Sequence, residues 1–256
     1  MEQARARAPT SCLDVHAGPP SGAAAARAVA VLQPYLFPYL GTFQLARQVR
    51  RFVFFDDVTF IKKGYVHRNA LLVDGCAHPV TAPVRNASQN RTIAEHEYVG
   101  DWAPFLALLA RAYADAPFFG PVQALVRGVL LDPDENVARK NARSVAAVFD
   151  YLGLAFDHGF SSRHGLPPTL RGAERVRAVC RLEGAAMYVN PAGGRSLYDA
   201  ADFECQGLSL RFCSMRDVRY AQRAATFVPN LSIIDVLMHC APRRVAALLD
   251  ECDLLP

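Results

Sequence analysis

Short apolar runs alternate along this chain with segments of helical periodicity, and this alternation limits the possible folds most strongly. VAVLQ, residues 29–33, is apolar up to its final Gln, as expected of a strand covered by helices on both faces. RFVFFDDV, residues 51–58, is predicted as a second strand that ends in two carboxylates. Further strands are predicted at AMYVN, residues 186–190, and LSLRFC, residues 208–213. The pattern predicts a layered α/β fold, an αβα domain with a largely parallel sheet.

Helical spacing of apolar residues is clear in two long segments, residues 102–113 and 141–152. The second has a start signal in DPDEN, residues 132–136, and a stop signal in Gly153. A shorter helix is predicted after Thr42, which is its expected N-cap. Three more helices are predicted at residues 172–185, 231–239 and 243–251.

One segment, residues 59–84, interrupts the alternation of strands and helices. Its pattern predicts short antiparallel strands that turn at Asp74-Gly75, and therefore a small antiparallel β insertion. Residues 1–27 show no apolar periodicity and no continuous hydrophobic region, so we interpret them as a disordered extension and not as a secretory signal. Residues 28–256 are predicted to form a single domain.

Charge and cysteine content exclude several classes of protein. The balance of 28 basic against 24 acidic residues is mild, and no Lys/Arg cluster forms a stripe, so no nucleic-acid partner is expected. The apolar stretches fall well short of the roughly 20 residues that span a bilayer, so no membrane partner is expected. The seven cysteines lack CxxC spacing, which favours a reducing cytoplasm. We expect neither a metal site nor a cofactor.

Ligands of open α/β sheets bind beyond the carboxyl ends of the strands, and QPYLFPYLG, residues 33–41, follows the first predicted strand. Its two prolines stop both strand and helix and fix an extended path. Tyr35, Phe37 and Tyr39 are then placed to wall a pocket above a helix N-terminus, which attracts a phosphate or a carboxylate. The alternative is a rigid, aromatic-packed connection without a ligand.

The stretch after the second predicted strand has the highest density of chemically active side chains. Asp56, Asp57 and His67 are candidate bases, while Lys62 and Arg68 are candidate partners for an anionic group. The alternative is that the carboxylates cap a turn and the cations lie on a solvated edge.

A third stretch, NPAGGRSLYD at residues 190–199, contains two adjacent glycines that allow close approach of the backbone to a ligand. Without other support, however, an ordinary turn is the favoured interpretation. Cys180 is a candidate nucleophile, but its spacing with Val176 and Val179 favours a small buried side chain in the core.

In this order, the three stretches resemble the WbqC-like proteins, known from bacterial O-antigen and other polysaccharide or natural-product gene clusters. The matching motifs are Q-P-x-x-F-P-x-x-G-x-F at residues 33–43, D-D-V-x-F-x-K at residues 56–62 with Arg-Asn at 68–69, and F-x-P-x-L-S-I-I-D-x-L-M at residues 227–238. Arg175, Cys180 and residues 190–199 match further parts of the pattern. One departure is His67, where many members carry Asn.

The resemblance implies an acyl- or aminoacyl-transferase, of the glycyl-transferase kind, that acts on an amine or hydroxyl of an amino sugar or natural-product intermediate. The donor expected is a thioester, for example on an acyl or peptidyl carrier protein. In direct transfer an aspartate or His67 is the base and Lys62, Arg68 or the glycine backbone stabilises the oxyanion; in covalent transfer Cys180 takes the acyl group first.

The candidate residues form two groups. The catalytic candidates are Asp56, Asp57, Lys62, His67 and Cys180. The substrate-binding candidates are Gln33, Tyr35, Phe37, Tyr39, Arg68, Asn69, Arg175, Asn190, Gly193, Gly194, Tyr198 and Asp199. Two alternatives to a transferase are a nucleotide-dependent activating enzyme, for which no P-loop, GxGxxG or HxGH motif is found, and a non-catalytic ligand-binding or scaffold protein of a biosynthetic complex.

Overall fold

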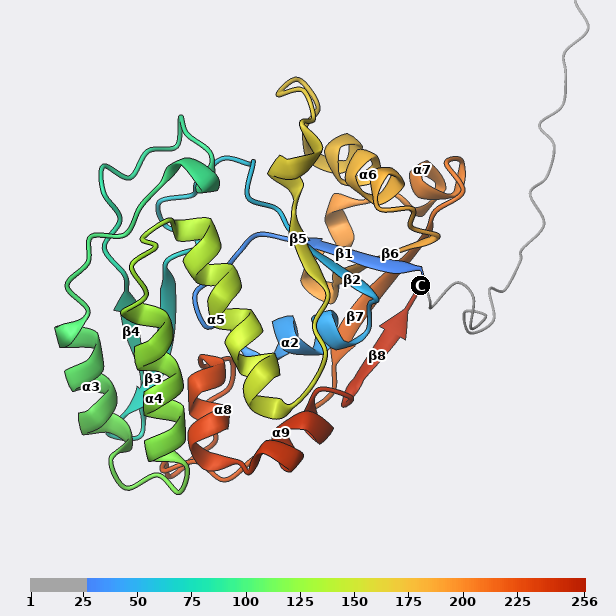
Figure 1. Ribbon diagram of the computed structural model, residues 1–256. Helices are drawn as coiled ribbons and strands as arrows, with labels where there is room; N and C mark the ends of the chain where they lie inside the picture. The colour runs from blue at the N-terminus through green and yellow to red at the C-terminus, as the bar shows by residue number, and fades with distance from the viewer. Residues whose placement is uncertain (1–26) are drawn as a thin grey trace, which may run out of the picture.

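A six-stranded sheet forms the centre of the protein (Figure 1). The computed structural model describes residues 27–256, so the predicted extension lies, except for Arg27, outside the described residues. The strand order is β5-β2-β1-β6-β7-β8, with β8 antiparallel to β7 and the other pairs parallel. The strands are β1 (Ala28–Leu32), β2 (Arg51–Phe54), β5 (His158–Phe160), β6 (Met187–Pro191), β7 (Ser209–Met215) and β8 (Cys252–Leu255).

Helices cover both faces of this sheet, which confirms the predicted α/β class with a mostly parallel sheet. Helices α6 (Gly172–Leu182) and α7 (Ala200–Glu204) pack on one face, where Val176, Val179 and Phe203 meet alternate strand residues. Helices α2 (Leu40–Arg47), α5 (Val137–Leu152) and α9 (Pro242–Leu248) lie on the opposite side in Figure 1. The two faces are thus closed by two separate apolar clusters.

A second layer lies outside α5. It contains a hairpin of β3 (Arg68–Val73) and β4 (Cys76–Thr81), with α3 (Ala103–Tyr113), α4 (Phe119–Leu130) and α8 (Ile233–His239) around it. Asp74 and Gly75 have φ values of 50° and 76° in the turn, so the antiparallel insertion is confirmed. Short 3-10 helices are found at η1 (Ile93–Glu95), η2 (Ser161–His164) and η3 (Ala192–Leu197). None of the helices among residues 27–256 is both long and apolar enough to cross a membrane.

Two helices show where signals in the local sequence were sufficient to predict a helix boundary and where they were not. The predicted signals of α5 are confirmed, because the Asn136 side chain accepts a hydrogen bond from the Arg139 N–H at 3.1 Å and Gly153 ends the helix at φ 67°. The N-cap prediction for Thr42 is wrong. Helix α2 begins earlier, at Leu40, with Tyr39 as N-cap, because Tyr39 is fixed by a β-bridge to Ser232 and the chain turns directly after Pro38.

The carboxyl ends of β1 and β6 are the point where the strand order changes direction. Strand β1 is followed in sequence by β2 on one side, whereas β6 is followed by β7 on the other side. In open α/β sheets a crevice forms at such a switch point, and ligands bind there.

Candidate functional site

A cavity of about 820 Å³ lies at this switch point. Its walls come from the loop after β1, from residues 63–70 that lead into and begin β3, from Pro79 of β4, from Pro191 and Gly193 after β6, and from Asn230. The structure therefore brings together parts of all three stretches that the sequence analysis selected. Among the predicted site residues, five line this cavity: Tyr35, Tyr39, Arg68, Asn69 and Gly193.

Three tyrosines, Tyr35, Tyr39 and Tyr65, line the cavity. No hydrogen bond within residues 27–256 involves their hydroxyls, whereas the buried hydroxyls of Tyr98 and Tyr113 each have a partner. Burial, followed by the neighbouring Tyr39 and Tyr65, raises the pKa of Tyr35 to about 12, and burial also raises the pKa of Tyr39. At neutral pH the hydroxyls of Tyr35 and Tyr39 stay protonated, so they are donors that a ligand can use.

The charged residues of the cavity lining are both cations. Lys63 and Arg68 are exposed at the cavity, and no Asp or Glu among the described residues lines it. The Arg68 guanidinium donates to the Lys63 carbonyl at 3.1 Å, which fixes its orientation. Lys62, a predicted catalytic residue, is exposed on the same loop but outside the lining. A cavity with cations, neutral donors and no carboxylate favours an anionic ligand.

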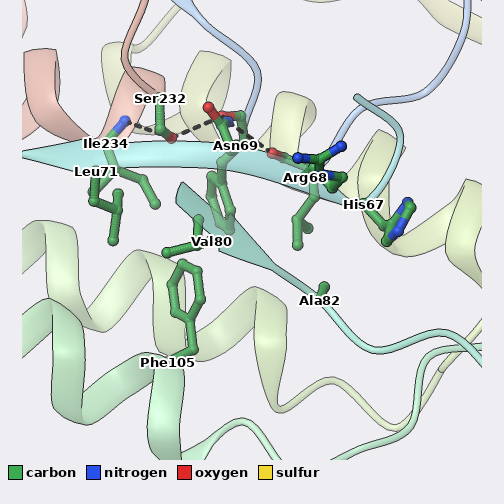
Figure 2. A pocket seen from close by; sticks show the side chains of 11 residues that line it. His67, Arg68, Asn69, Leu71, Val80, Ala82, Phe105, Ser232 and Ile234 are labelled. Atoms are coloured by element: carbon green, nitrogen blue, oxygen red, sulfur yellow. Dashed lines mark hydrogen bonds between the residues drawn. The ribbon is translucent and has the colours of Figure 1, made fainter. Parts of the chain in front are cut away.

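The loop after β1 is held in a strained shape by three side chains. Phe37 has φ 43°, which is unusual for a bulky residue. Its N–H donates to Ser144 Oγ at 2.9 Å, and its carbonyl accepts from Ser232 Oγ at 2.8 Å and from Asn69 Nδ2. Figure 2 shows the two donors, Asn69 and Ser232, close together. The Phe37 ring is buried and does not line the large cavity, so it anchors the loop that carries Tyr35 and Tyr39.

His67 lies beside a second cavity of about 10 Å³, which has room for about one water molecule (Figure 2). Its ring packs on Phe60, with centroids 5.1 Å apart, and Phe60 stacks on His96 at 4.4 Å. Burial, followed by the charge of Arg68, lowers the pKa of His67, and burial lowers that of His96. Both imidazoles are therefore neutral in the fold at neutral pH, and His67 does not line the large cavity.

Replacing His67 by asparagine is expected to weaken the acid sensitivity of the fold. A folded-state pKa below the ordinary 6.5 means that the unfolded chain binds more protons, so stability falls as pH falls below about 6.5. The stability difference between pH 7.5 and 5.5 should shrink in His67→Asn by up to about 1.4 kcal/mol. Urea unfolding at both pH values measures it, with His78→Asn on exposed β4 as control. An unchanged difference would show that His67 is not held neutral.

Asp56 and Asp57 belong to a buried polar network below the ends of β2 and β5. Asp56 accepts from the Ser162 N–H at 2.9 Å, from Ser162 Oγ at 2.7 Å and from Ser161 Oγ at 3.2 Å. Asp57 forms an ion pair with Arg175 and accepts from Ser161 Oγ. Neither carboxylate lines the cavity. Their oxygens are occupied by protein donors, which favours a structural role over that of a general base.

Arg175 connects this network to the loop that precedes α6. Besides Asp57, its guanidinium donates to the carbonyls of Pro167 at 2.9 Å and Leu170 at 3.2 Å. Arg175 is 5% exposed, so the structure places it in the protein interior and not at the cavity. It positions the chain between β5 and α6.

Cys180 is fully buried in the cluster between α6 and the sheet, together with Val176 and Val179. Burial raises the pKa of its thiol to about 12. A thiol in this state is a poor nucleophile at neutral pH. Cys180 also lies outside the lining of the cavity, so this geometry favours a packing role.

The stretch after β6 contributes one wall and a rigid support. Asn190 Oδ1 accepts from the Tyr188 hydroxyl at 2.8 Å, and that hydroxyl lies 3.4 Å from the Tyr198 hydroxyl. A Cβ on Gly194 would lie 2.1 Å from Asn190 Nδ2, so a larger residue there would displace the Asn190 side chain. Asp199 accepts from the Ala201 N–H at 3.0 Å and caps α7. Gln33 is partly exposed at the end of β1, outside the lining.

Several residues of the cavity and its support were not selected from the sequence. Lys63 and Tyr65 belong to the same KKGY run as Lys62, so its density of cations was a usable signal. Ser144 sits in a helical pattern without any feature that marks it, whereas Ser232 belongs to the F-x-P-x-L-S-I-I-D-x-L-M motif and caps α8. Within the described residues, no group of three or more His, Cys, Asp or Glu side chains is arranged to hold a metal ion.

Comparison with known proteins gives a family and one curated relative. A family model described as "WbqC-like protein family" matches residues 33–247. The "Uncharacterized protein Rv1507c" of Mycobacterium tuberculosis is 26% identical over 216 residues, which cover 82% of this chain and 93% of that protein. No solved structure matches this chain.

Proposed function

We propose that this chain, which belongs to the WbqC-like protein family, binds an anionic acceptor in the switch-point cavity and transfers an acyl or aminoacyl group to it. The acceptor atom is an amine or hydroxyl of an amino sugar or natural-product intermediate, and the donor is a thioester. The six cysteines among residues 27–256 are free thiols, which suits the reducing cytoplasm that we propose as its location.

The donor set of the cavity carries this proposal. Tyr35, Tyr39 and Tyr65 offer three hydroxyls that have no hydrogen-bond partner among residues 27–256, and Lys63 and Arg68 add two cations. A site of this kind stabilises a phosphoryl or carboxylate group and orients the polar groups next to it. It disfavours a cationic ligand, because no carboxylate of the described residues lines the cavity.

Direct transfer fits the geometry better than transfer through the enzyme. The acceptor nitrogen attacks the thioester carbonyl carbon, a C–N bond forms, the C–S bond breaks, and the leaving thiolate takes up the proton that the amine loses. An amine with a pKa of about 8 has enough neutral form near pH 7 to react without a strong base. Protein donors then stabilise the oxyanion, and the cavity orients the reactants. Tyr35 and the Gly193 backbone are the candidate groups.

Replacing Arg68 by alanine tests the ligand class. Calorimetric affinity for glucosamine 6-phosphate is expected to fall about tenfold, because a charge-assisted hydrogen bond is lost. Affinity for uncharged N-acetylglucosamine should not change. Arg111→Ala, at an exposed position on α3, is the control. Equal binding of both sugars by the wild type and Arg68→Ala would contradict the proposal, as would failure to release thiol from any acyl or aminoacyl thioester when acceptors are added.

A non-catalytic binding protein is the second candidate. The observation that favours it is that no carboxylate, histidine or cysteine of the described chain lines the cavity. This candidate predicts tight, Arg68-dependent binding of the anionic ligand without thiol release from any thioester in the panel. The transferase predicts Arg68-dependent binding of the anionic ligand and also thiol release from a thioester.

A further inference from the structure

We propose that the first turn of α2 is the subsite for a phosphoryl group of the ligand, bound by the Gly41 N–H, Thr42 Oγ1 and the Tyr39 hydroxyl. This inference deepens the proposed function and rests on it, since it takes the switch-point cavity as the ligand site. Helix α2 begins near the carboxyl end of β1, and its N-cap Tyr39 and its third residue Thr42 line the cavity. An N-terminus carries about half a positive charge and free N–H groups.

Thr42 provides an observation that is independent of the helix end. Its side chain is 3% exposed and lines the cavity, and Thr42 Oγ1 has no hydrogen-bond partner in the described chain. A threonine at the third position of a helix has no capping function here, because Tyr39 is the N-cap. A buried hydroxyl without a partner is unfavourable in the free protein, and a ligand oxygen that accepts from it would remove this cost.

Gly41 and Tyr39 complete the subsite. A Cβ added to Gly41 would lie 2.5 to 2.8 Å from the outer atoms of the Tyr39 ring, including 2.8 Å from its hydroxyl oxygen. Glycine is therefore required so that the Tyr39 hydroxyl can rest against the first turn of the helix. The Gly41 N–H makes no hydrogen bond to another described residue, while the Thr42 N–H donates to the Tyr39 carbonyl at 3.1 Å.

The number and kind of donors favour a phosphoryl group over a carboxylate. The Gly41 N–H and the hydroxyls of Thr42 and Tyr39 are three separate donors at the start of α2. This number suits the three non-bridging oxygens of a phosphoryl group. Lys63 and Arg68 lie on another wall of the same cavity and neutralise the charge that the helix end leaves uncompensated. We therefore assign the ligand as a phosphate ester, such as a sugar phosphate. Inorganic phosphate has the same phosphoryl oxygens, so the subsite should recognise it as well.

Thr42→Val tests the subsite, because valine keeps the shape and removes the hydroxyl. The variant should be at least as stable as the wild type in urea unfolding, since it removes a buried hydroxyl without a partner. Its Kd for glucosamine 6-phosphate should rise about tenfold. Thr42→Ser should bind like the wild type. Thr169→Val, at an exposed threonine, is the control. The Gly41 amide resonance should shift when glucosamine 6-phosphate or inorganic phosphate is added to the full-length chain.

The outcomes separate the subsite from the proposed function. If Arg68→Ala weakens binding of glucosamine 6-phosphate but Thr42→Val does not, and the Gly41 resonance does not move, the subsite is wrong and the cavity remains the ligand site. If the wild type binds phosphorylated and other anionic sugars no more tightly than uncharged N-acetylglucosamine, the proposed function fails together with the subsite. Lower stability of Thr42→Val, with unchanged affinity, would show that the hydroxyl supports the fold and would also overturn the subsite.

Discussion

Replacing Arg175 by methionine is expected to lower the free energy of unfolding by about 3–5 kcal/mol, the range for breaking a buried ion pair from one side. The change leaves the partly buried Asp57 carboxylate with Ser161 as its remaining donor. It also removes the donors to the carbonyls of Pro167 and Leu170. Urea unfolding followed by circular dichroism measures the loss.

An exposed pair provides the matched control for this change. Arg216 and Asp253 are joined by several hydrogen bonds but are each about half exposed, so Arg216→Met should leave the stability close to that of the wild type. In the double variant Asp57→Leu/Arg175→Met, part of the stability should return, because no uncompensated charge remains. If Asp57→Asn instead keeps full stability and abolishes thioester consumption, Asp57 is a catalytic base and the structural role is wrong.

Asn69→Ala is expected to have the second largest effect, a loss of about 2–3 kcal/mol together with weaker ligand binding. The Asn69 amide donates to the carbonyls of Leu36 and Phe37, and removing it leaves two partly buried acceptors short of a donor. Because Phe37 is held at a positive φ, the loop should relax toward a more common backbone conformation. That movement displaces Tyr35 and Tyr39 from the cavity wall, so calorimetric affinity for the anionic ligand should fall as well.

Two other variants calibrate this prediction. Ser144→Ala removes one hydrogen bond to the Phe37 N–H and should cost about 1 kcal/mol. Asn90→Ala, at an exposed loop position, should change neither stability nor binding. If Asn69→Ala lost stability but kept full affinity, the strained loop would not be what positions the two tyrosines.

The sequence predicted those parts of the fold whose signals are local. Apolar runs, the caps at Asn136 and Gly153 and the Asp74-Gly75 turn were sufficient to predict most strands, α5 and the β3–β4 hairpin. Strands β5 and β8 have only three and four residues, which is too short for periodicity to show. Helix α4 and the early start of α2 also escaped prediction, the latter because a bridge to Ser232, nearly two hundred residues away, fixes Tyr39.

The candidate site was predictable to a similar extent. Tyr35, Tyr39 and Arg68 follow strand ends, and the general location of ligands in α/β sheets was sufficient to select them. The hydrogen bonds of the two carboxylates could not be predicted, because they come from Ser161 and Ser162, which follow the unpredicted strand β5. The partners of a carboxylate decide whether it is free to act as a base, and those partners lie more than a hundred residues from Asp56 and Asp57.

The cavity walls are assembled from segments that begin at Leu32 and end at Asn230, and this has a consequence for how the chain acquires its ligand. Contacts of such high sequence separation form late and slowly in folding, because long loops must close first. A chain emerging from the ribosome therefore lacks a complete pocket until nearly all of it has been synthesised. Since only the finished fold binds, ligand present in the cell shifts the folding equilibrium toward that state, and the midpoint of thermal unfolding should rise with ligand concentration.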